Sequence, residues 1–378
     1  MNRQHWLTQL TEAFKIIPVT AILGPRQCGK TTLAKAYAKS HTNTHLFDME
    51  DPQDQAILEE PLTALSKLEG LIIIDEIQRQ PEIFPIIRTL VDQKLKQKYL
   101  ILGSASRDLI KQSSETLAGR IFHLELTPFS FIETRGLNHL WLRGGFPLSY
   151  LSDSNEDSML WRKHYIRTFI ERDIQQLGIN IPANTLHRFW MMLTDYHGNL
   201  FNASEIGRAF GISHITTWKY LDILVGTFMV RELQPWFENI SKRQVKSPKI
   251  YLLDTGLYQA FLDISQPEQL SHSRKLGASW EGFALEEVIR IHQAMPEECF
   301  FWATQASAEL DFLLFRQGKR LGFEFKYIDA PSRTKSMLQA QRDLKLDQLT
   351  VIYPGEKTYS LGEGIEAIGL HTYLQKHK

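Results

Sequence analysis

The sequence predicts an α/β protein: a parallel sheet with helices on both faces, then a helical part, then a smaller mixed α/β part. Three observations predict this fold class. Short apolar runs typical of strands alternate with longer helical stretches over residues 1–130. Short helices and an extended arm follow at residues 185–236. A long helical stretch and two strands joined by a short turn, Gln-Gly-Lys, then occupy the last part of the chain.

The predicted parallel sheet consists of five apolar runs separated by helical stretches. The runs are residues 19–23, 45–47, 71–74, 99–102 and 121–126. The third run, Leu-Ile-Ile-Ile, contains no polar residue, as expected for a strand that is covered on both faces. This alternation predicts a parallel sheet wound with helices.

The length of 378 residues favours two or three domains. Glycines and prolines interrupt the pattern over residues 128–147, so the first domain is expected to end near the carboxyl end of this segment. We therefore expect domains at residues 1–150, 151–240 and 241–378.

Composition excludes several classes of protein. Lys and Arg number 43, as do Asp and Glu, so the formal net charge is zero and no overall positive field attracts nucleic acid. Cys28 and Cys299 lie far apart and outside any paired Cys or His spacing, which argues against a disulfide framework or a structural zinc site. The amino-terminal residues lack the apolar core of a signal peptide, and no apolar run approaches the roughly 18 residues of a membrane span. A cytoplasmic protein with no membrane partner is expected.

A glycine-rich loop between the first strand and the following helix is the strongest functional motif. It comprises Gly24, Pro25, Arg26, Gln27, Cys28, Gly29, Lys30, Thr31 and Thr32. Glycines let such a loop wrap around a β-phosphate with its N–H groups pointing inward, at the positive end of a helix. Lys30 is expected to contact the β and γ phosphates, and the Thr31 hydroxyl to coordinate Mg²⁺. The loop predicts a nucleoside triphosphate with its magnesium ion.

An acidic pair agrees with this prediction. Asp75 and Glu76 follow the apolar run 71–74 at its carboxyl end. Asp75 is expected to hold the magnesium ion directly or through water, and Glu76 to polarise the attacking water. With the loop, the pair predicts a nucleoside triphosphatase that uses Lys30, Asp75 and Glu76.

Two more residues are candidate catalytic groups. Ser104 follows the fourth apolar run, where a hydroxyl could contact the γ phosphate or the water, and a turn serine is the alternative. Arg120 precedes the fifth run and is a candidate to sense the γ phosphate in cis or in trans, with Arg107 as its rival. An ordinary surface arginine is the alternative for both.

The chain resembles, over nearly its whole length, the bacterial AAA-type ATPases that are fused to a carboxy-terminal domain of unknown function. The matching stretches are residues 24–32, 71–78, 117–120 with the following Phe-His-Leu-Glu-Leu-Thr-Pro-Phe-Ser-Phe, 143–147, 171–173 and 246–257. The resemblance implies a three-part architecture and ATP as the nucleotide.

Residues 202–224 are typical of a helix, a tight turn at Gly211 and a second helix capped by Ser213. With residues 228–233 as a wing strand, the pattern predicts a winged helix-turn-helix domain. Its expected core is Ile206, Phe210, Ile215, Trp218, Leu221 and Leu224. Its expected groove-facing residues are Ser213, His214, Thr216, Thr217 and Lys219.

Charge limits the DNA prediction for this domain. Residues 185–236 carry four Lys or Arg and four Asp or Glu, which is zero net, whereas phosphate contacts dominate DNA affinity. A basic patch for DNA would have to come from Lys242, Arg243, Lys246 and Lys249, which follow. The alternative is a winged helix that packs as a lid on the ATPase.

The carboxy-terminal part places a helix glutamate, Glu281, before a strand aspartate, Asp311, and a Glu324-x-Lys326 triplet on the next strand. Glu324 and Lys326 share one face of their strand. This order looks like the PD-(D/E)xK core of restriction-endonuclease-like nucleases, although Leu310 stands where the motif has proline. It predicts carboxylates for a magnesium ion and a lysine for the water. The alternatives are an exposed charged hairpin and a nuclease-like fold used only for binding.

Together these features predict an ATP-hydrolysing ATPase that couples its nucleotide state to a winged helix and a nuclease-like domain acting on or near DNA. The expected ligands are ATP and Mg²⁺, with DNA and a second copy of the chain as candidate partners. The alternatives are a nucleotide-controlled protein-interaction switch with an inactive carboxy-terminal domain, and a transcriptional regulator.

Overall fold

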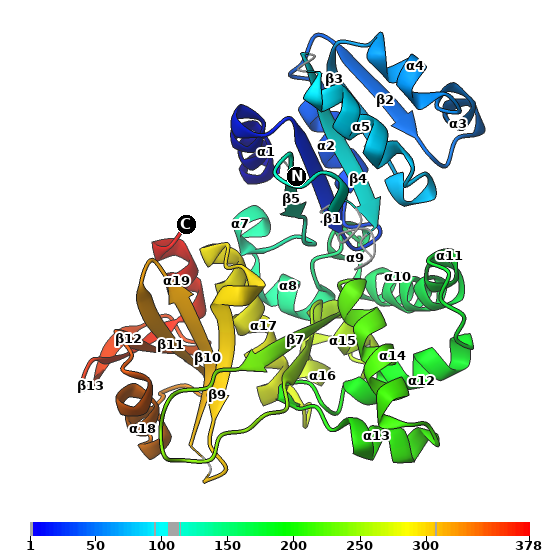
Figure 1. Cartoon of the computed structure of the whole chain (residues 1–378). Coiled ribbons are helices and arrows are strands. Elements are labelled where there is room, and N and C mark those ends of the chain that lie inside the picture. The colour runs from blue at the N-terminus through cyan, green and yellow to red at the C-terminus, as the bar shows by residue number, and fades with distance from the viewer. Residues whose placement is uncertain (1–2, 94–95, 105–112, 114, 307) are drawn as a thin grey trace. The chain divides into compact units, whose positions relative to one another are not determined.

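The computed structural model describes residues 3–93, 96–104, 113, 115–306 and 308–378. The chain divides into two compact units (Figure 1). The first consists of Met1–Pro128 and Gly226–Phe228, and the second of Phe129–Val225 and Met229–Lys378. The boundary near residue 128 precedes the expected one at residue 150, and the expected second and third domains share one unit. The reason is that strand β7 (Val230–Pro235) pairs on one side with β8 (Lys249–Leu252) and on the other with β9 (Cys299–Ala303).

The first unit contains a parallel five-stranded sheet in the order β2-β3-β4-β1-β5. The strands are β1 Val19–Gly24, β2 Thr44–Asp48, β3 Gly70–Asp75, β4 Gln97–Ser104 and β5 Ile121–Glu125. The helices are α1 Gln4–Ile16, α2 Lys30–Ala38, α3 Pro52–Ile57, α4 Pro61–Ser66, the 3₁₀ helix η1 Ile77–Arg79 and α5 Ile83–Asp92. Each strand coincides with one of the five predicted apolar runs.

Helices cover both faces of this sheet, as predicted. Along β3, Ile72 and Ile74 belong to one apolar cluster, and Leu71 and Ile73 belong to another. The first cluster includes the buried side chains of α5, and the second includes most of the buried side chains of α1 and α2. A strand buried on both faces needs a continuous apolar sequence, which explains the unbroken Leu-Ile-Ile-Ile run.

The second unit contains a nine-stranded mixed sheet in the order β13-β14-β12-β11-β10-β9-β7-β8-β6. Its remaining strands are β6 Asn199–Leu200, β10 Glu309–Arg316, β11 Lys319–Phe325, β12 Gln348–Tyr353, β13 Thr358–Gly362 and β14 Ile365–Gly369. Its helices up to β7 are α7 Phe131–Thr134, α8 Leu137–Arg143, α9 Pro147–Tyr150, α10 Asn155–Thr168, the π-helix Phe169–Asp173, α11 Ile174–Gln176, α12 Ala183–Leu193, α13 Ala203–Phe210 and α14 His214–Gly226. The later ones are α15 Thr255–Phe261, α16 Pro267–Ser271, α17 Leu276–His292, the 3₁₀ helix η3 Pro296–Glu298, α18 Lys335–Leu344 and α19 Leu370–Lys376.

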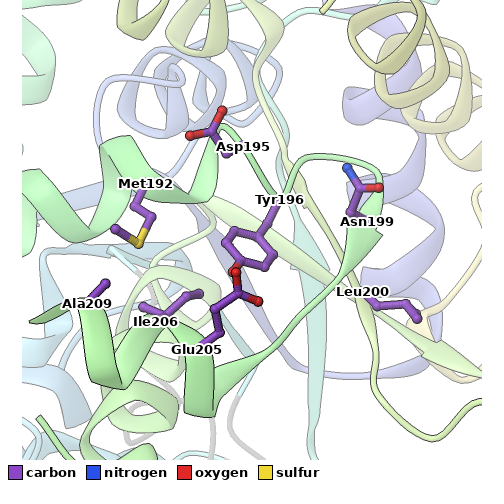
Figure 2. A pocket seen from close by; sticks show the side chains of 8 residues that line it. All are labelled: Met192, Asp195, Tyr196, Asn199, Leu200, Glu205, Ile206 and Ala209. Atoms are coloured by element: carbon purple, nitrogen blue, oxygen red, sulfur yellow. The ribbon is translucent and has the colours of Figure 1, made fainter.

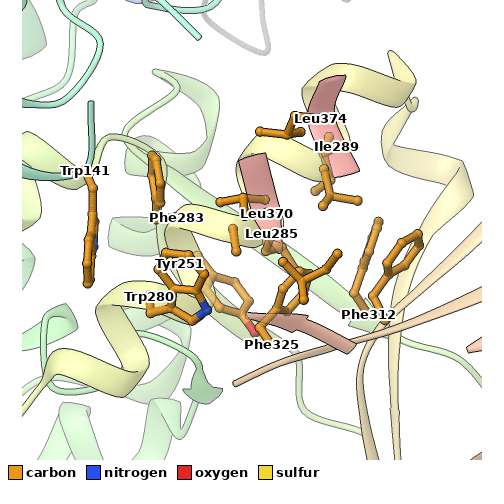
Figure 3. Packing of buried hydrophobic residues seen from close by; sticks show 14 of the residues in the cluster. Trp141, Tyr251, Trp280, Phe283, Leu285, Ile289, Phe312, Phe325, Leu370 and Leu374 are labelled. Carbon is orange, nitrogen blue, oxygen red and sulfur yellow. The ribbon is translucent and has the colours of Figure 1, made fainter. Parts of the chain in front are cut away.

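Helix α17 packs on the sheet of the second unit through an aromatic and aliphatic cluster (Figure 3). Trp280 and Phe283 of this helix meet Trp141, whose ring centroid lies 5.3 Å from that of Trp280. A separate cluster joins the apolar side of α18 to β10 and β12. The hairpin β10–β11 is therefore held between two apolar layers, which fixes the positions of its charged residues.

The structure contains the predicted pair of helices, α13 and α14, joined by a tight turn at Gly211. Gly211 adopts a left-handed conformation with φ of 66° at the turn, and Ser213 Oγ accepts a hydrogen bond of 3.1 Å from the N–H of Thr216. Two side-chain predictions are wrong. Ile215 is 58% exposed rather than in the core, and Thr217 is buried rather than groove-facing, with its hydroxyl donating to the Ser213 carbonyl.

Within the described ranges, none of the helices combines the length and apolar character that spanning a bilayer requires.

Candidate functional site

The glycine-rich loop joins β1 directly to α2, and glycines occupy the positions where the backbone excludes side chains. Gly24 has a φ of 157°, and a Cβ there would lie 2.3 Å from the carbonyl oxygen of Leu126. Gly29 has a φ of 100° at the amino terminus of α2, a conformation that L-residues rarely adopt. The loop therefore enters α2 with its backbone at the positive end of the helix.

Lys30 and Thr31 are the first residues of α2, and both face polar partners. The Lys30 ammonium is buried and donates to the carbonyl oxygens of Gly24 and Pro25, both at 3.0 Å. The Thr31 hydroxyl donates to Asp75 Oδ2 at 2.6 Å. Asp75 ends β3, and its other oxygen accepts the N–H of Glu76 at 2.9 Å. The loop and the acidic pair thus meet at the carboxyl edge of the sheet, although β4 lies between their strands.

Glu76 sits in an unusual backbone conformation next to this pair. Its φ is 53°, and its carboxylate accepts a hydrogen bond from the Gln78 side-chain amide. Burial raises the pKa of Glu76, and the Lys30 charge and the Gln78 hydrogen bond partly oppose that shift. A carboxylate with a raised pKa is a stronger proton acceptor, which suits a group that acts on water.

The donor set fits a magnesium–triphosphate ligand. Mg²⁺ prefers oxygen donors, and the Thr31 hydroxyl and the Asp75 carboxylate present them side by side. The loop N–H groups, the amino terminus of α2 and the Lys30 ammonium suit the phosphates.

Other predicted loop residues have structural contacts. Arg26 pairs with Glu50 at 3.1 Å, and Glu50 also pairs with Arg79 at 2.8 Å. Cys28 is fully buried, and burial raises the pKa of its thiol. Gln27 and Thr32 are exposed, and both cysteines of the chain are free.

Arg3 contacts this loop and was not predicted from the sequence. Its guanidinium donates to the Cys28 carbonyl at 2.8 Å and to the Thr127 carbonyl at 2.7 Å. It thereby ties the loop to the segment that follows β5. A single charged residue near the amino terminus belongs to no periodic pattern, so the sequence offered no signal for this contact.

Ser104 and Arg120, the other two candidate catalytic residues, lie at opposite edges of the sheet. The Ser104 backbone aligns with that of Gly24 at the carboxyl end of the sheet, while its side chain and all of Arg107 lie outside the described residues. Arg120 precedes β5, which is parallel to β1, so it lies at the opposite edge of the sheet from the loop. It forms a two-pronged pair with Asp92, at 2.6 and 3.1 Å. This position does not fit an arginine that senses the γ phosphate in cis.

The four residues predicted as a nuclease-like site do converge in the second unit. Lys326 Nζ lies 2.7 Å from Glu324 Oε2 and 3.3 Å from Asp311 Oδ2. Asp311 Oδ2 also accepts the N–H of Phe325 at 2.9 Å. The charges of Asp311 and Lys326 both act on Glu281 of α17. Asp311 and Glu324 are 6% and 4% exposed, so an exposed charged hairpin is excluded.

Lys249 belongs to this cluster rather than to the predicted basic patch. Its side chain is 6% exposed, and its ammonium lies 3.5 Å from Glu281 Oε1 and 3.9 Å from Asp311 Oδ1, in addition to a pair with Glu309. Of the other patch residues, Lys242 pairs with Asp343 at 2.7 Å, and Arg243 and Lys246 are exposed. The sequence analysis singled out Lys249 as part of a basic patch because a count of charges cannot distinguish a buried lysine from an exposed one.

Two further members of the cluster were missed. The Tyr251 hydroxyl donates to Glu281 Oε1 at 2.7 Å, and Glu309 pairs with Lys249. Tyr251 lies two residues after Lys249, and Glu309 two residues before Asp311. Residues two apart on a strand share a face, and this periodicity was the signal that could have found them.

Burial and mutual charge shift the pKa values in this cluster. Burial, reinforced by the Asp311 charge, raises the pKa of Glu281 to about 7 and that of Glu324 to about 8. For Asp311 burial acts in the same direction, but Lys326 and Lys249 outweigh it and lower the pKa. Burial alone would lower the pKa of Lys249, yet the neighbouring acidic groups raise it well above its ordinary value. Lys249 is therefore a permanent cation at neutral pH.

A pocket beside α13 was not predicted (Figure 2). Its lining is Met192, Asp195, Tyr196, Asn199, Leu200, Glu205, Ile206 and Ala209. Burial and the neighbouring Glu205 raise the pKa of Tyr196, whose ring points toward that carboxylate. The carboxylates of Asp195 and Glu205 disfavour phosphate groups in this pocket.

Three family models match consecutive parts of the chain. A model described as an AAA domain matches residues 17–135, and two described as domains of unknown function, DUF8612 and DUF4143, match residues 134–268 and 276–373. Among solved structures, the chain is similar to the Walker-type ATPase of Pyrococcus abyssi, with 16% identity over 69% of this chain and 95% of that one and a TM-score of 0.47. Cdc6p of Pyrobaculum aerophilum shows 12% identity over 71% and 94% of the two chains, with a TM-score of 0.29.

Relatives match the chain over nearly its full length. The protein MJ1544 of Methanocaldococcus jannaschii is 22% identical over 89% of this chain and 82% of its own length. The proteins Rv2008c of Mycobacterium tuberculosis and Mb2031c of Mycobacterium bovis are each 45% identical over 371 residues, which are 97% of this chain and 83% of theirs. The chain therefore belongs to the family of these two mycobacterial proteins, and its first unit contains an AAA-type P-loop ATPase domain.

Proposed function

We propose that this protein binds ATP with Mg²⁺ at residues 24–32 and hydrolyses it, and that the nucleotide state controls the second unit. The observation that carries the proposal is the 2.6 Å contact between the Thr31 hydroxyl and the Asp75 carboxylate. It joins the two predicted magnesium ligands, one from the start of α2 and one from the end of β3, beside a buried lysine and a carboxylate with a raised pKa.

Each group has a distinct role in this proposal. Thr31 and Asp75 would hold the magnesium ion, which supplies charge neutralisation for the phosphates. The Lys30 ammonium exchanges its two carbonyl partners for phosphate oxygens, and the loop N–H groups bind the β phosphate. Glu76 orients a water molecule and accepts its proton, for which its raised pKa is suited.

The test is the ATP turnover of the full chain with Mg²⁺ and with excess chelator. Lys30→Ala is expected to abolish nucleotide binding and turnover. Lys35→Ala is the matched control, because Lys35 lies on the same helix but is exposed. Turnover that is equal in wild type and Lys30→Ala would contradict the proposal.

DNA is the proposed partner of the second unit. Support comes from the helix-turn-helix, on which Ser213, His214 and Lys219 are exposed, and from the exposed Arg243 and Lys246. The double charge reversal Arg243→Glu/Lys246→Glu is expected to weaken DNA binding and to reduce its salt dependence. Lys163→Glu is the control, because Lys163 is exposed and already paired with Asp263. DNA that stimulates ATP turnover favours a DNA-associated ATPase over a transcriptional regulator.

A nucleotide-controlled protein-interaction switch is the competing outcome of the same assays. It is favoured if the chain binds no DNA at moderate salt with or without ATP. Metal-dependent cleavage of nucleic acid forms no part of the proposed function, because ammonium groups already contact the carboxylates that would hold its metal.

A further inference from the structure

The buried charge cluster of the second unit contains a cation that does not come from its nuclease-like motif. Glu281, Asp311 and Glu324 lie on α17, β10 and β11, and Lys326 directly follows β11, whereas Lys249 comes from β8. Its ammonium lies within 4 Å of Glu281, Glu309 and Asp311. Lys249 therefore sits among the carboxylates that the motif would offer to a metal ion.

Two ammonium groups occupy all the motif carboxylates. Lys249 contacts Glu281 and Asp311, and Lys326 contacts Asp311 and Glu324. Asp311 is shared, with Oδ1 toward Lys249 and Oδ2 toward Lys326. Among the residues that the structure describes, no group of three His, Cys, Asp or Glu side chains has an arrangement that could hold a metal ion. The residues present do not fit the divalent cation that the motif implies.

The position of Lys249 is fixed by its strand. It pairs with Leu233 of β7 on one side and with Leu200 of β6 on the other. Its ammonium also lies 5.6 Å from the ring centroid of the buried Phe301. The paired backbone fixes where the side chain starts, and its burial beside Phe301 keeps the ammonium among the carboxylates.

We propose that the Lys249 ammonium takes the place of a divalent cation in this cluster, so that the carboxylates of Glu281, Asp311 and Glu324 bind no metal in the intact protein. The cluster then joins α17 and β8 to the β10–β11 hairpin through buried ion pairs. The nuclease-like arrangement serves to hold the second unit together rather than to cleave phosphodiesters. A buried carboxylate set that loses its cation is strongly destabilised, which makes Lys249 the critical residue.

The test is a gain of metal binding when the lysine is removed. Mn²⁺ binding to the nucleotide-free full chain is measured by electron paramagnetic resonance, and thermal unfolding is followed with and without Mn²⁺. Lys249→Met keeps a side chain of similar length but removes the cation that lies beside Glu281 and Asp311, while Lys326 remains. It is expected to lower the unfolding midpoint and to gain one Mn²⁺ site. At about a hundredfold excess over Kd, Mn²⁺ is expected to raise the midpoint by about 5 °C or more.

Two control variants make the result specific. Lys249→Arg keeps a cation in place and is expected to gain no site. The double variant Lys249→Met/Asp311→Asn is expected to lose the gained site, because Asp311 is the carboxylate shared by both lysines.

The wild-type protein tests the proposal even if Lys249→Met does not fold. The single variant Asp311→Asn is expected to bind Mn²⁺ to the same extent as the wild-type protein. A Mn²⁺ ion that wild type binds and Asp311→Asn loses would overturn the proposal. So would a folded Lys249→Met variant that gains no Mn²⁺ site.

Discussion

The Thr31 hydroxyl, at the start of α2, donates a hydrogen bond of 2.6 Å to Asp75 at the end of β3. The two residues are 44 positions apart in the sequence, and a third strand separates the strands that lead to them. The parallel arrangement brings both strand ends to one edge of the sheet, where the helix dipole and Lys30 already favour anions.

Substitutions of Thr31 and Asp75 test this contact. Thr31→Ala removes a hydroxyl that would hold Mg²⁺, so the Mg²⁺ concentration for half-maximal ATP turnover is expected to rise roughly 10–100-fold. Asp75→Asn is expected to show a similar rise because it removes the carboxylate charge. Thr31→Ser retains the hydroxyl and should remain close to wild type. A Thr31→Ala variant with an unchanged Mg²⁺ requirement would place the metal ligands elsewhere.

Glu76 is expected to give the ATPase a pH dependence on the acidic side. Only the ionised carboxylate accepts a proton, so turnover rises with pH through the pKa of Glu76. Burial raises that pKa above the ordinary value for a glutamate, so the rise shifts to higher pH than for an exposed glutamate. Glu76→Gln is expected to bind ATP, to lower turnover by about 10²–10⁴-fold and to abolish this rise. The check is a pH–rate profile of both proteins beside equilibrium ATP binding, and the assignment fails if Glu76→Gln turns over at the wild-type rate.

Arg3 is expected to position the phosphate loop. Its hydrogen bonds to the Cys28 and Thr127 carbonyls are charge-assisted, and each is worth about 1.5–3 kcal/mol. Arg3→Ala is expected to weaken ATP binding about tenfold or more while turnover at saturating ATP changes less, because Arg3 touches the loop backbone rather than the acidic pair.

Alkylation of Cys28 gives an independent measure of loop order in Arg3→Ala. The thiol is buried and its pKa is raised, so it should resist alkylation in wild type and react faster in the variant. Lys15→Ala, which removes an exposed ion pair on helix α1 directly after Arg3, is the control. An Arg3→Ala protein with normal KM for ATP and an unreactive Cys28 would show that Arg3 does not order the loop.

The sheet of the first unit could be predicted because its strands are continuous apolar runs that alternate with helical stretches, and a run such as Leu71 to Ile74 fits a strand covered on both faces. The union of residues 151–240 and 241–378 in one unit could not, because it depends on the pairing of β7 with β9, whose residues lie far apart in the sequence. Local patterns contain no information on such a pairing.

In the candidate sites too, local patterns could predict some residues, whereas others depend on contacts between distant parts of the chain. Asp311, Glu324 and Lys326 could be placed together because strand alternation and a short turn determine their faces. Lys249 could not, because its partners lie on two elements, α17 and β10, that come much later in the chain. On α14, the sequence pattern predicted Ile215 in the core and Thr217 at the surface. In the structure Ile215 is exposed, and Thr217 is buried with its hydroxyl donating to the Ser213 carbonyl.

Arg120 is expected to be dispensable for ATP turnover by a single chain. It lies at the edge of the sheet opposite the phosphate loop, and its guanidinium is held by Asp92, whose pKa the Arg120 hydrogen bond and charge lower. Arg120→Ala should therefore retain wild-type turnover at low protein concentration, with Asp92→Ala as the matched variant that frees the arginine. If Arg120→Ala lost turnover and regained it when mixed with Glu76→Gln, the arginine would act in trans on a second copy of the chain, because each variant would then supply the group that the other lacks. Turnover measured across a dilution series distinguishes the two outcomes, since only the trans arrangement makes the specific activity fall as the protein is diluted.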